Sequence, residues 1–187
     1  MAVMRHLGQT DLARQVASES IQRDRLDLGA YYEHFLLNGV PTYRDLMREH
    51  VHNYIEVSLD YAHAGLFEDA IGLLKEAPPV NPMVHYYLGW FYLQRGDPAA
   101  KAAFEEAANM PPDYCFPNRI ECIPVLEAAM EHNPDDAFAP YYLGNFWYGH
   151  RCYDEAINCW EHARQLNPQF PTVHRNLGLA CTSLRLP

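Results

Sequence analysis

The sequence predicts an all-α fold, a right-handed superhelical solenoid built from antiparallel helix pairs. Helix-like stretches follow one another along the 187 residues with short turns between them, and no alternating pattern typical of strands competes with them. The tetrapeptide YYLG stands at 86–89 and again at 141–144. A third Leu-Gly pair, Leu177-Gly178, follows the second after 34 residues. A period of this length indicates repeated units that bury their apolar faces by stacking on each other.

The expected helices follow from this periodicity and from the prolines. Proline lacks the N–H group that a continuing helix needs. Four prolines are therefore expected to mark the ends of second helices: Pro82, Pro112, Pro134 and Pro168. The predicted helices span residues 1–6, 10–24, 28–37, 42–63, 67–76, 82–95, 98–109, 119–132, 137–149, 153–166 and 171–184.

One unit carries a complete pattern of small and large residues. Its Leu-Gly pair is followed by aromatic residues, alanines and a proline in fixed order: Leu143, Gly144, Trp147, Ala156, Trp160, Ala163 and Pro168. This run resembles the tetratricopeptide repeat, a helix–turn–helix unit in which small residues let two helices approach closely. A second copy surrounds Gly89, and a third has Val57-Ser58 in place of Leu-Gly. The resemblance implies an array of helix pairs.

The repeats predict a single array over residues 1–187. The best units span 51–82, 83–112 and 137–170, and half units span 1–25, 119–134 and 171–187. The run PPDYCFPNR is expected to replace one first helix, because it is too rich in proline to be helical. The last helix has no partner helix for its apolar residues Leu177, Leu179, Leu184 and Leu186. We therefore expect a piece of a longer protein or, alternatively, a homodimer through this uncapped helix.

Longer segments resemble one group of large bacterial proteins, in which a tetratricopeptide array follows an amino-terminal β-rich domain of unknown function. The most specific segment is MPPDYCFPNRIECIPVLEAAMEHNPDDAFAPYYLGNFWYGHRCYDEAINCW, since its proline-rich insert is not part of the general repeat. NYIEVSLDYAHAGLFEDAIGLL and LNPQFPTVHRNLGLA carry the resemblance as well. This resemblance implies a scaffold attached to another domain, in a carbohydrate-related context, and names no chemistry for this chain.

Charge and composition exclude several classes of function. The chain has 24 Asp and Glu against 14 Lys and Arg, a formal net charge of -10, whereas nucleic-acid binding needs a basic face. No apolar stretch approaches the roughly 18 residues of a membrane span, and the amino-terminal residues lack the apolar core of a signal peptide. The five cysteines are an odd number spread through helical sequence, which favours a reducing compartment. We expect a cytoplasmic protein.

No motif indicates catalysis or a cofactor. The sequence has no nucleophile elbow, phosphate-binding loop or zinc-protease motif. Cys159 and His162 share a helix, but the paired spacing of a structural zinc site does not occur. The acidic pair Asp135-Asp136 is expected at a helix start, where it complements the helix dipole or is simply solvated. We predict no catalytic residue, no metal and no cofactor.

The resemblance also implies where binding would happen, because fixed positions of the first helices line a concave groove in such arrays. In the last three units these positions hold Met83, Tyr86, Tyr87, Trp90, Phe138, Tyr141, Asn145, Tyr148, Arg175 and Asn176. In the unit before them they hold His52, Ile55, Glu56, Leu59, Ala62 and His63. Tyrosine and tryptophan suit peptide capture because they supply a large contact area at low entropic cost. The alternative, for Tyr87 and Tyr142 above all, is that the rings only pack between helices.

Three functions stay open on this basis. The first is a non-catalytic scaffold that binds a protein or peptide segment, neutral or basic, in the groove. The second is a spacer or oligomerisation module of a larger protein. The third is a small-ligand site, such as a sugar stacked on Tyr86, Trp90 or Tyr148. Some tetratricopeptide-repeat proteins bind the terminal carboxylate of a peptide with Lys, Arg and Asn side chains of successive units. This set is incomplete here, because Tyr141 lies at the position of the first lysine.

Overall fold

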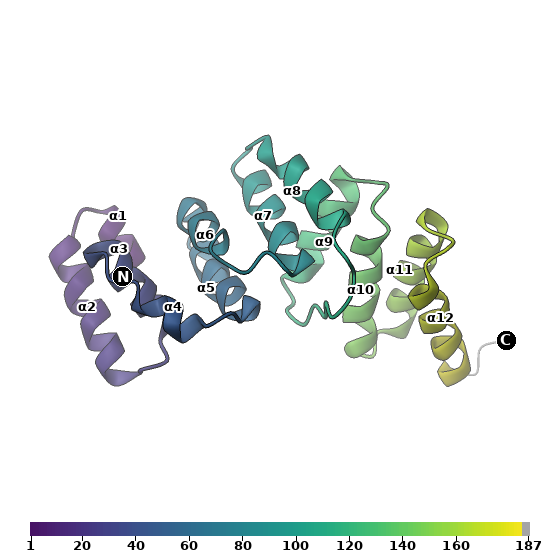
Figure 1. The fold of residues 1–187 in the computed structure, drawn as a ribbon, viewed down its shortest axis with the longest axis horizontal. Coiled ribbons are helices and arrows are strands. Elements are labelled where there is room, and N and C mark those ends of the chain that lie inside the picture. The colour runs from purple at the N-terminus through teal and green to yellow at the C-terminus, as the bar shows by residue number, and fades with distance from the viewer. Residues whose placement is uncertain (185–187) are drawn as a thin grey trace. The chain divides into compact units, whose positions relative to one another are not determined.

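The computed structural model describes the backbone of residues 1–184 and the side chains of residues 1–180, and the regular elements of this part are helices (Figure 1). Twelve helices and no strand occur in the described part of the chain. The predicted all-α fold class is confirmed. The chain divides into two compact units, Met1–Pro78 and Pro79–Pro187, and each is described by itself. The single superhelical array over both units remains a prediction.

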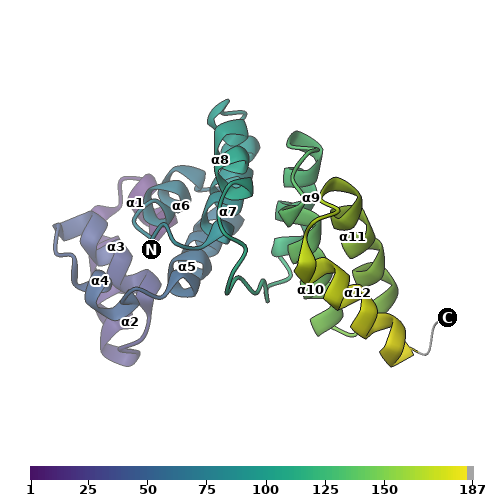
Figure 2. The ribbon, with the colours of Figure 1, turned by 45° about the vertical axis from the view of Figure 1, so that its right-hand side comes forward.

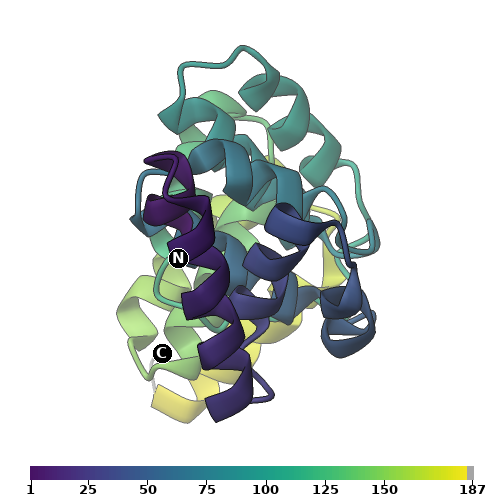
Figure 3. The ribbon, with the colours of Figure 1, turned by 90° about the vertical axis from the view of Figure 1, so that its left-hand side faces the viewer.

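The first unit contains six helices, whose first members are dark purple in Figure 3. They are α1 (Ala2–His6), α2 (Thr10–Arg23), α3 (Leu28–Asn38), α4 (Thr42–Met47), α5 (Val51–His63) and α6 (Phe67–Leu74). The side chain of Asp27 starts α3 by accepting a hydrogen bond from Ala30 N at 2.9 Å. Gly39 ends it in the left-handed conformation, with φ 75°. The main packing pairs are α2 with α3, α3 with α4, and α5 with α6.

The predicted helix 42–63 is wrong as one element, because the chain breaks it between α4 and α5. Arg48 has φ 52° and ψ -149°, and His50 is extended. Side chains from α5 hold the break: Asn53 Nδ2 donates to Met47 O at 3.2 Å. The break turns α4 so that Tyr43 is fully buried against Tyr32 of α3, with ring centroids 5.0 Å apart. No glycine or proline marks this break in the sequence, so the pattern alone gives no signal for it.

The second unit also contains six helices. They are α7 (Pro82–Gln94), α8 (Ala99–Ala108), α9 (Cys122–His132), α10 (Phe138–Gly149), α11 (Tyr153–Leu166) and α12 (Pro171–Leu184). Figure 2 shows α7 beside α8, α10 beside α11, and α11 beside α12. Apart from the broken helix, all predicted boundaries lie within three residues of these bounds. The predicted residues Leu184 and Leu186 lie outside the side chains that the structure describes.

The proline-rich insert is not helical, as predicted. α9 packs directly on α7 and α10, with no first helix of its own between them. Cys115 anchors the insert: its side chain is buried, and its Sγ lies 3.6 Å from Asn81 Oδ1. Its neighbours Tyr114 and Phe116 are exposed. The insert thus takes the place of one helix in the second unit.

Candidate protein-interaction surfaces

Four of the ten predicted groove residues are part of the core. Met83, Tyr86, Tyr87 and Tyr141 are all buried, so their side chains are not offered at the surface of this structure. The Tyr86 ring packs edge-on against Tyr142, with centroids 5.9 Å apart. The same correction holds in the first unit, where Ile55, Leu59 and Ala62 of α5 are buried. Counting positions from the repeat places these residues on the correct helices. The structure, however, has their side chains in the core and not at the surface.

Asp136 provides a buried hydrogen-bond acceptor for the hydroxyl group of Tyr86. Its side chain is only 3% exposed, which corrects the alternative of a solvated acid and leaves that of an acid at a helix start. One carboxylate oxygen accepts from Tyr86 OH at 2.7 Å, and the other from Phe138 N at 2.8 Å. Burial raises the pKa of Asp136, while the hydrogen bonds from Tyr86, Phe138 and Ala139 act in the opposite direction. Asp136 therefore caps α10 from within the core, and the pair with Tyr86 is structural.

Trp90 and Phe138 are half-buried. The Phe138 ring meets Phe170 edge-on, with centroids 5.3 Å apart, and Trp90 packs beside Phe91 at 5.7 Å. Both rings serve mainly as packing surfaces between helices. Among the described residues, the ring contacts of Trp90 and Phe138 are made with other aromatic residues and not with the remaining predicted groove residues.

The other four predicted residues are brought together. Asn145 of α10 accepts at its Oδ1 from Trp160 Nε1 and from Asn176 Nδ2, each at 3.2 Å. Asn176 of α12 in turn accepts from the Arg175 guanidinium at 3.1 Å. Tyr148 lies beside the same indole, with centroids 5.3 Å apart. We call Asn145, Tyr148, Arg175 and Asn176 the amide cluster.

The amide cluster offers hydrogen-bond donors to solvent. Asn145 uses its oxygen for both internal bonds, and within the described residues its Nδ2 has no acceptor. Arg175 is exposed and forms no ion pair with any described residue. The donors lie on α10 and α12, the first helices of two successive helix pairs. They can therefore bind acceptors that follow one another along a single bound peptide. The arrangement suits backbone carbonyl groups or a carboxylate.

The first unit has a different surface, which sequence counting missed. A groove of about 500 Å³ lies against α5 and the start of α3. We call it the acidic groove; it is lined by Asp24, Leu26, Asp27, Leu28, Gly29, Leu46, Asn53, Glu56, Val57 and Asp60. Of these residues, only Glu56 was expected to face a groove. The signal that could have found it is the spacing of Glu56 and Asp60, which puts two carboxylates on one face of α5.

Metal ligands and reactive thiols were sought among the described residues. No group of three or more His, Cys, Asp or Glu side chains is placed to hold a metal ion among them. Burial raises the pKa of the Cys115 and Cys122 thiols to about 12, so neither is a ready nucleophile. In the part of the chain that was described, no helix is both long and apolar enough to cross a membrane.

One family model matches the chain. It is described as TPR repeat, the tetratricopeptide repeat, and it covers residues 153–182. The matched segment contains α11 and most of α12, including the predicted positions Ala156, Trp160 and Gly178. For this segment the resemblance to tetratricopeptide repeats is confirmed. No curated protein matches the chain.

Several solved structures are similar over most of the chain. One is MamA, at 19% identity and a TM-score of 0.37, covering 98% of this chain and 83% of MamA. Another is the first TPR of Spaghetti (RPAP3) bound to the HSP90 peptide SRMEEVD, at 17% identity and 0.36, covering 72% and 93%. YrrB, a TPR protein with an unusual peptide-binding site, has 17% identity and 0.35, covering 90% and 84%. At these scores the function has to be inferred from the chain's own residues.

Proposed function

We propose that this chain is a non-catalytic protein-interaction module, and that its second unit binds an extended segment of a partner protein at the amide cluster. The observation that carries the proposal is the set of unused donors on α10 and α12, of which Asn145 Nδ2 is the clearest. An extended peptide presents a carbonyl group every 3.3 Å or so along its backbone. Two amides and a guanidinium on successive helices can satisfy several of them at once.

The internal bonds of the cluster support this function. Because Trp160 and Asn176 both hold the oxygen of Asn145, the amide is fixed with its NH₂ group turned away from them. A fixed donor loses little entropy on binding, which favours affinity. Tyr148 adds a half-buried aromatic surface beside it, of the kind that is enriched at protein interfaces. The cluster therefore combines oriented donors with an apolar contact.

The test uses peptides selected from a random display library on the wild-type protein. Asn145→Asp keeps the oxygen that Trp160 and Asn176 need, but it replaces the outward NH₂ donor with a carboxylate oxygen. Selected peptides should bind this variant about tenfold more weakly, which corresponds to about 1.4 kcal/mol. Asn158→Asp on the exposed face of α11 adds the same charge and should change affinity less than about twofold. Equal affinities for the two variants would contradict the proposal.

Self-association through α12 is a second candidate, and one observation favours it. Leu179 is 56% exposed, one turn or less from the buried Leu177. Among the described elements, the main packing partner of α12 is α11. An exposed leucine on such a helix can be covered by the same helix of a second copy. The module would then space or dimerise the domain to which it belongs.

For the wider setting, we propose that the module belongs to a large cytoplasmic bacterial protein that also carries a β-rich domain. The three segments quoted above support this, above all the proline-rich insert. An antibody against this chain tests it in the source cells. A cytoplasmic band well above 21.5 kDa is the expected result, and a single band at that mass would contradict it.

A further inference from the structure

The proline-rich insert of the second unit presents large apolar side chains to solvent. It runs as a loop between α8 and α9 (Figure 1). Tyr114 is 91% exposed, and Phe116 and Ile120 are exposed as well. Aromatic rings remove a large apolar area from water when a partner covers them. Three such side chains within one short loop form an apolar patch of the kind that marks an interaction site.

The backbone of the insert holds this patch at the surface. Tyr114 has φ 57°, in the left-handed region that is unfavourable for a residue with a bulky side chain. The next side chain, Cys115, is buried, and its Sγ lies 3.6 Å from Asn81 Oδ1. A strained residue persists only where its surroundings fix it. The burial of Cys115 therefore leaves the rings on either side of it, Tyr114 and Phe116, outside the core.

The exposed surface continues from the insert along α9. Four exposed residues follow one another there at intervals of four, three and four positions: Ile120, Pro124, Glu127 and Glu131. This spacing places them on one side of a helix, while other residues of α9 are buried. At 1.5 Å per residue the line is about 16 Å long, or three helical turns. These four residues, together with Tyr114 and Phe116, are called the insert face.

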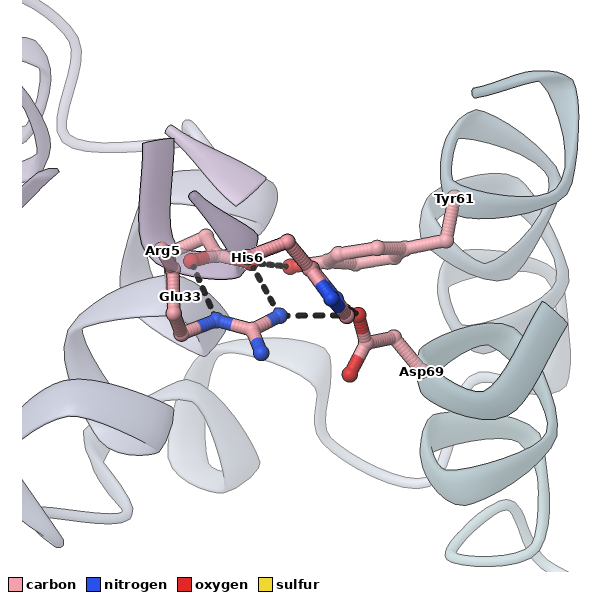
Figure 4. A network of polar contacts seen from close by, with 5 residues as sticks. All are labelled: Arg5, His6, Glu33, Tyr61 and Asp69. Atoms are coloured by element: carbon pink, nitrogen blue, oxygen red, sulfur yellow. Dashed lines mark hydrogen bonds and ion pairs between the residues drawn. The ribbon is translucent and has the colours of Figure 1, made fainter. Parts of the chain in front are cut away.

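The carboxylates of this surface are free to pair with a partner. Asp113 beside Tyr114, and Glu127 and Glu131 on α9, form no ion pair with any residue that the structure describes. The buried acid of the first unit differs, because the Arg5 guanidinium donates to both oxygens of Glu33 inside the fold (Figure 4). The insert face therefore offers negative charge that the fold itself does not use.

The partner that fits this face is apolar at one end and basic at the other. The face is apolar around Ile120 and acidic toward Glu131, and opposite charges across an interface favour association. A cation also interacts favourably with an exposed tyrosine ring. The only lysine or arginine of the insert, Arg119, is half-buried. A second copy of this chain fits less well, because each copy has a formal net charge of -10 and like charges repel.

We propose that the insert face binds an amphipathic helix of a partner protein that carries lysines or arginines at one end. The apolar residues of this helix cover Phe116 and Ile120, and its basic residues pair with Glu127 and Glu131. A helix of three turns matches the exposed line along α9, and helices pack on one another through such rows of side chains. The face lies on α9 and its loop, whereas the amide cluster lies on α10 and α12. The two surfaces are separate.

The probes are helical 20-residue peptides, selected from a display library on the wild-type protein and then made as fluorescent, end-blocked peptides for anisotropy. The aromatic variant is Tyr114→Asn with Phe116→Ser, because asparagine tolerates the left-handed conformation at 114. Its control is Leu26→Asn with Val40→Ser, which changes two exposed apolar residues of the first unit. The peptides should bind the aromatic variant at least about tenfold more weakly than the wild type, and the control variant within about twofold.

The charge variant tests the basic end of the bound helix. It is Glu127→Gln with Glu131→Gln, and its control is Asp45→Asn with Glu49→Gln, two exposed changes in the first unit. Both variants remove two negative charges. The selected peptides should be enriched in lysine and arginine at one end. They should bind the charge variant at least about fivefold more weakly than the wild type, and the control within about twofold.

Equal losses in the charge variant and its control would overturn the proposal, because they would show attraction to the overall charge only. Selected peptides that lack basic residues, or that bind the aromatic variant as tightly as the wild type, would also overturn it. A wild-type dimer in light scattering that the aromatic variant abolishes would assign the face to a second copy instead. Asn145→Asp should leave the affinity of the peptides unchanged, so failure of this surface and failure of the amide cluster are distinguishable.

Discussion

Gly144 lies so close to Trp160 that a Cβ atom at this glycine would stand 2.5 Å from Cδ1 and Nε1 of the indole ring. The same relationship recurs between Gly89 and Phe104, where the ring carbons would lie 2.6 Å away. In both cases a glycine of the first helix faces a large ring of the second, in α10 with α11 and in α7 with α8. The ring fills the space that a side chain would need, and this contact sets how closely each pair packs.

Replacing Gly144 with alanine should therefore destabilise the second unit. A buried ring and the Ala156 carbonyl at 3.1 Å leave the new methyl group no room, so the overpacking should cost about 1–3 kcal/mol. Urea unfolding measures the change in free energy of unfolding. Gly149→Ala on the same helix is the control, since nothing lies within 4 Å of a Cβ atom there. It should be neutral or stabilising by up to about 1 kcal/mol. A stable Gly144→Ala protein would refute the close contact.

Removing the Arg5 guanidinium should destabilise the first unit by about 3 kcal/mol. Arg5→Met leaves Glu33 buried without its cation, and the uncompensated charge is the main cost. Arg14→Met is the matched control, because Arg14 pairs with the almost fully exposed Asp11 and should contribute less than about 1 kcal/mol. Urea unfolding followed by circular dichroism compares the two variants. Equal small losses would mean that the Arg5 network contributes no more than a surface pair.

The buried Asp136 should make stability depend on pH in a defined direction. Burial raises the pKa of Asp136 in the folded protein above its ordinary value of 3.8, so the folded state holds this proton more tightly than the unfolded state. Its contribution is then fully present below the unfolded pKa and is lost as pH rises through the folded pKa. The difference in free energy of unfolding between the wild type and Asp136→Asn should fall as pH rises from about 3 to 7. If this difference rises instead, the hydrogen bonds outweigh burial and the pKa is lowered.

Leu179→Asp should leave the protein monomeric if α12 mediates self-association. Light scattering on a sizing column over a dilution series measures the mass. A wild-type dimer that this substitution abolishes, and that Leu26→Asp in the first unit does not, would support the second candidate function. Leu26 is a fair control because it too is an exposed leucine. A wild-type monomer at all concentrations would remove this candidate.

The sequence predicted the helix pairs because their signals are local. Small residues at Gly89 and Gly144 recur with the large rings Phe104 and Trp160, and each couple packs as the repeat implies. Even Ser58, which replaces glycine in an earlier unit, is fully buried on α5. The non-helical backbone of the proline-rich insert could also be predicted, because several prolines close together exclude a helix.

The features that the sequence did not predict depend on contacts between distant residues. Arg5 and Glu33 are 28 positions apart, and Tyr86 and Asp136 are 50 apart. Neither pair has a spacing that a helix or a turn would explain. The burial of Tyr86 and Tyr141 also depends on contacts between helices. Counting positions along the repeat cannot distinguish a residue on the concave face from one in the core. The break at Arg48 is stabilised by tertiary packing of Tyr43, which no local propensity records.

The most direct measurement of the central claim is a map of chemical shifts on adding a selected peptide to the isotope-labelled protein. The largest changes should fall on the side-chain amides of Asn145 and Asn176 and on the backbone of α10 and α12. Asn145→Asp should abolish these changes, and Asn158→Asp should leave them in place. Changes confined to other helices, with the Asn145 amide unmoved at saturation, would contradict the claim that the amide cluster binds the partner.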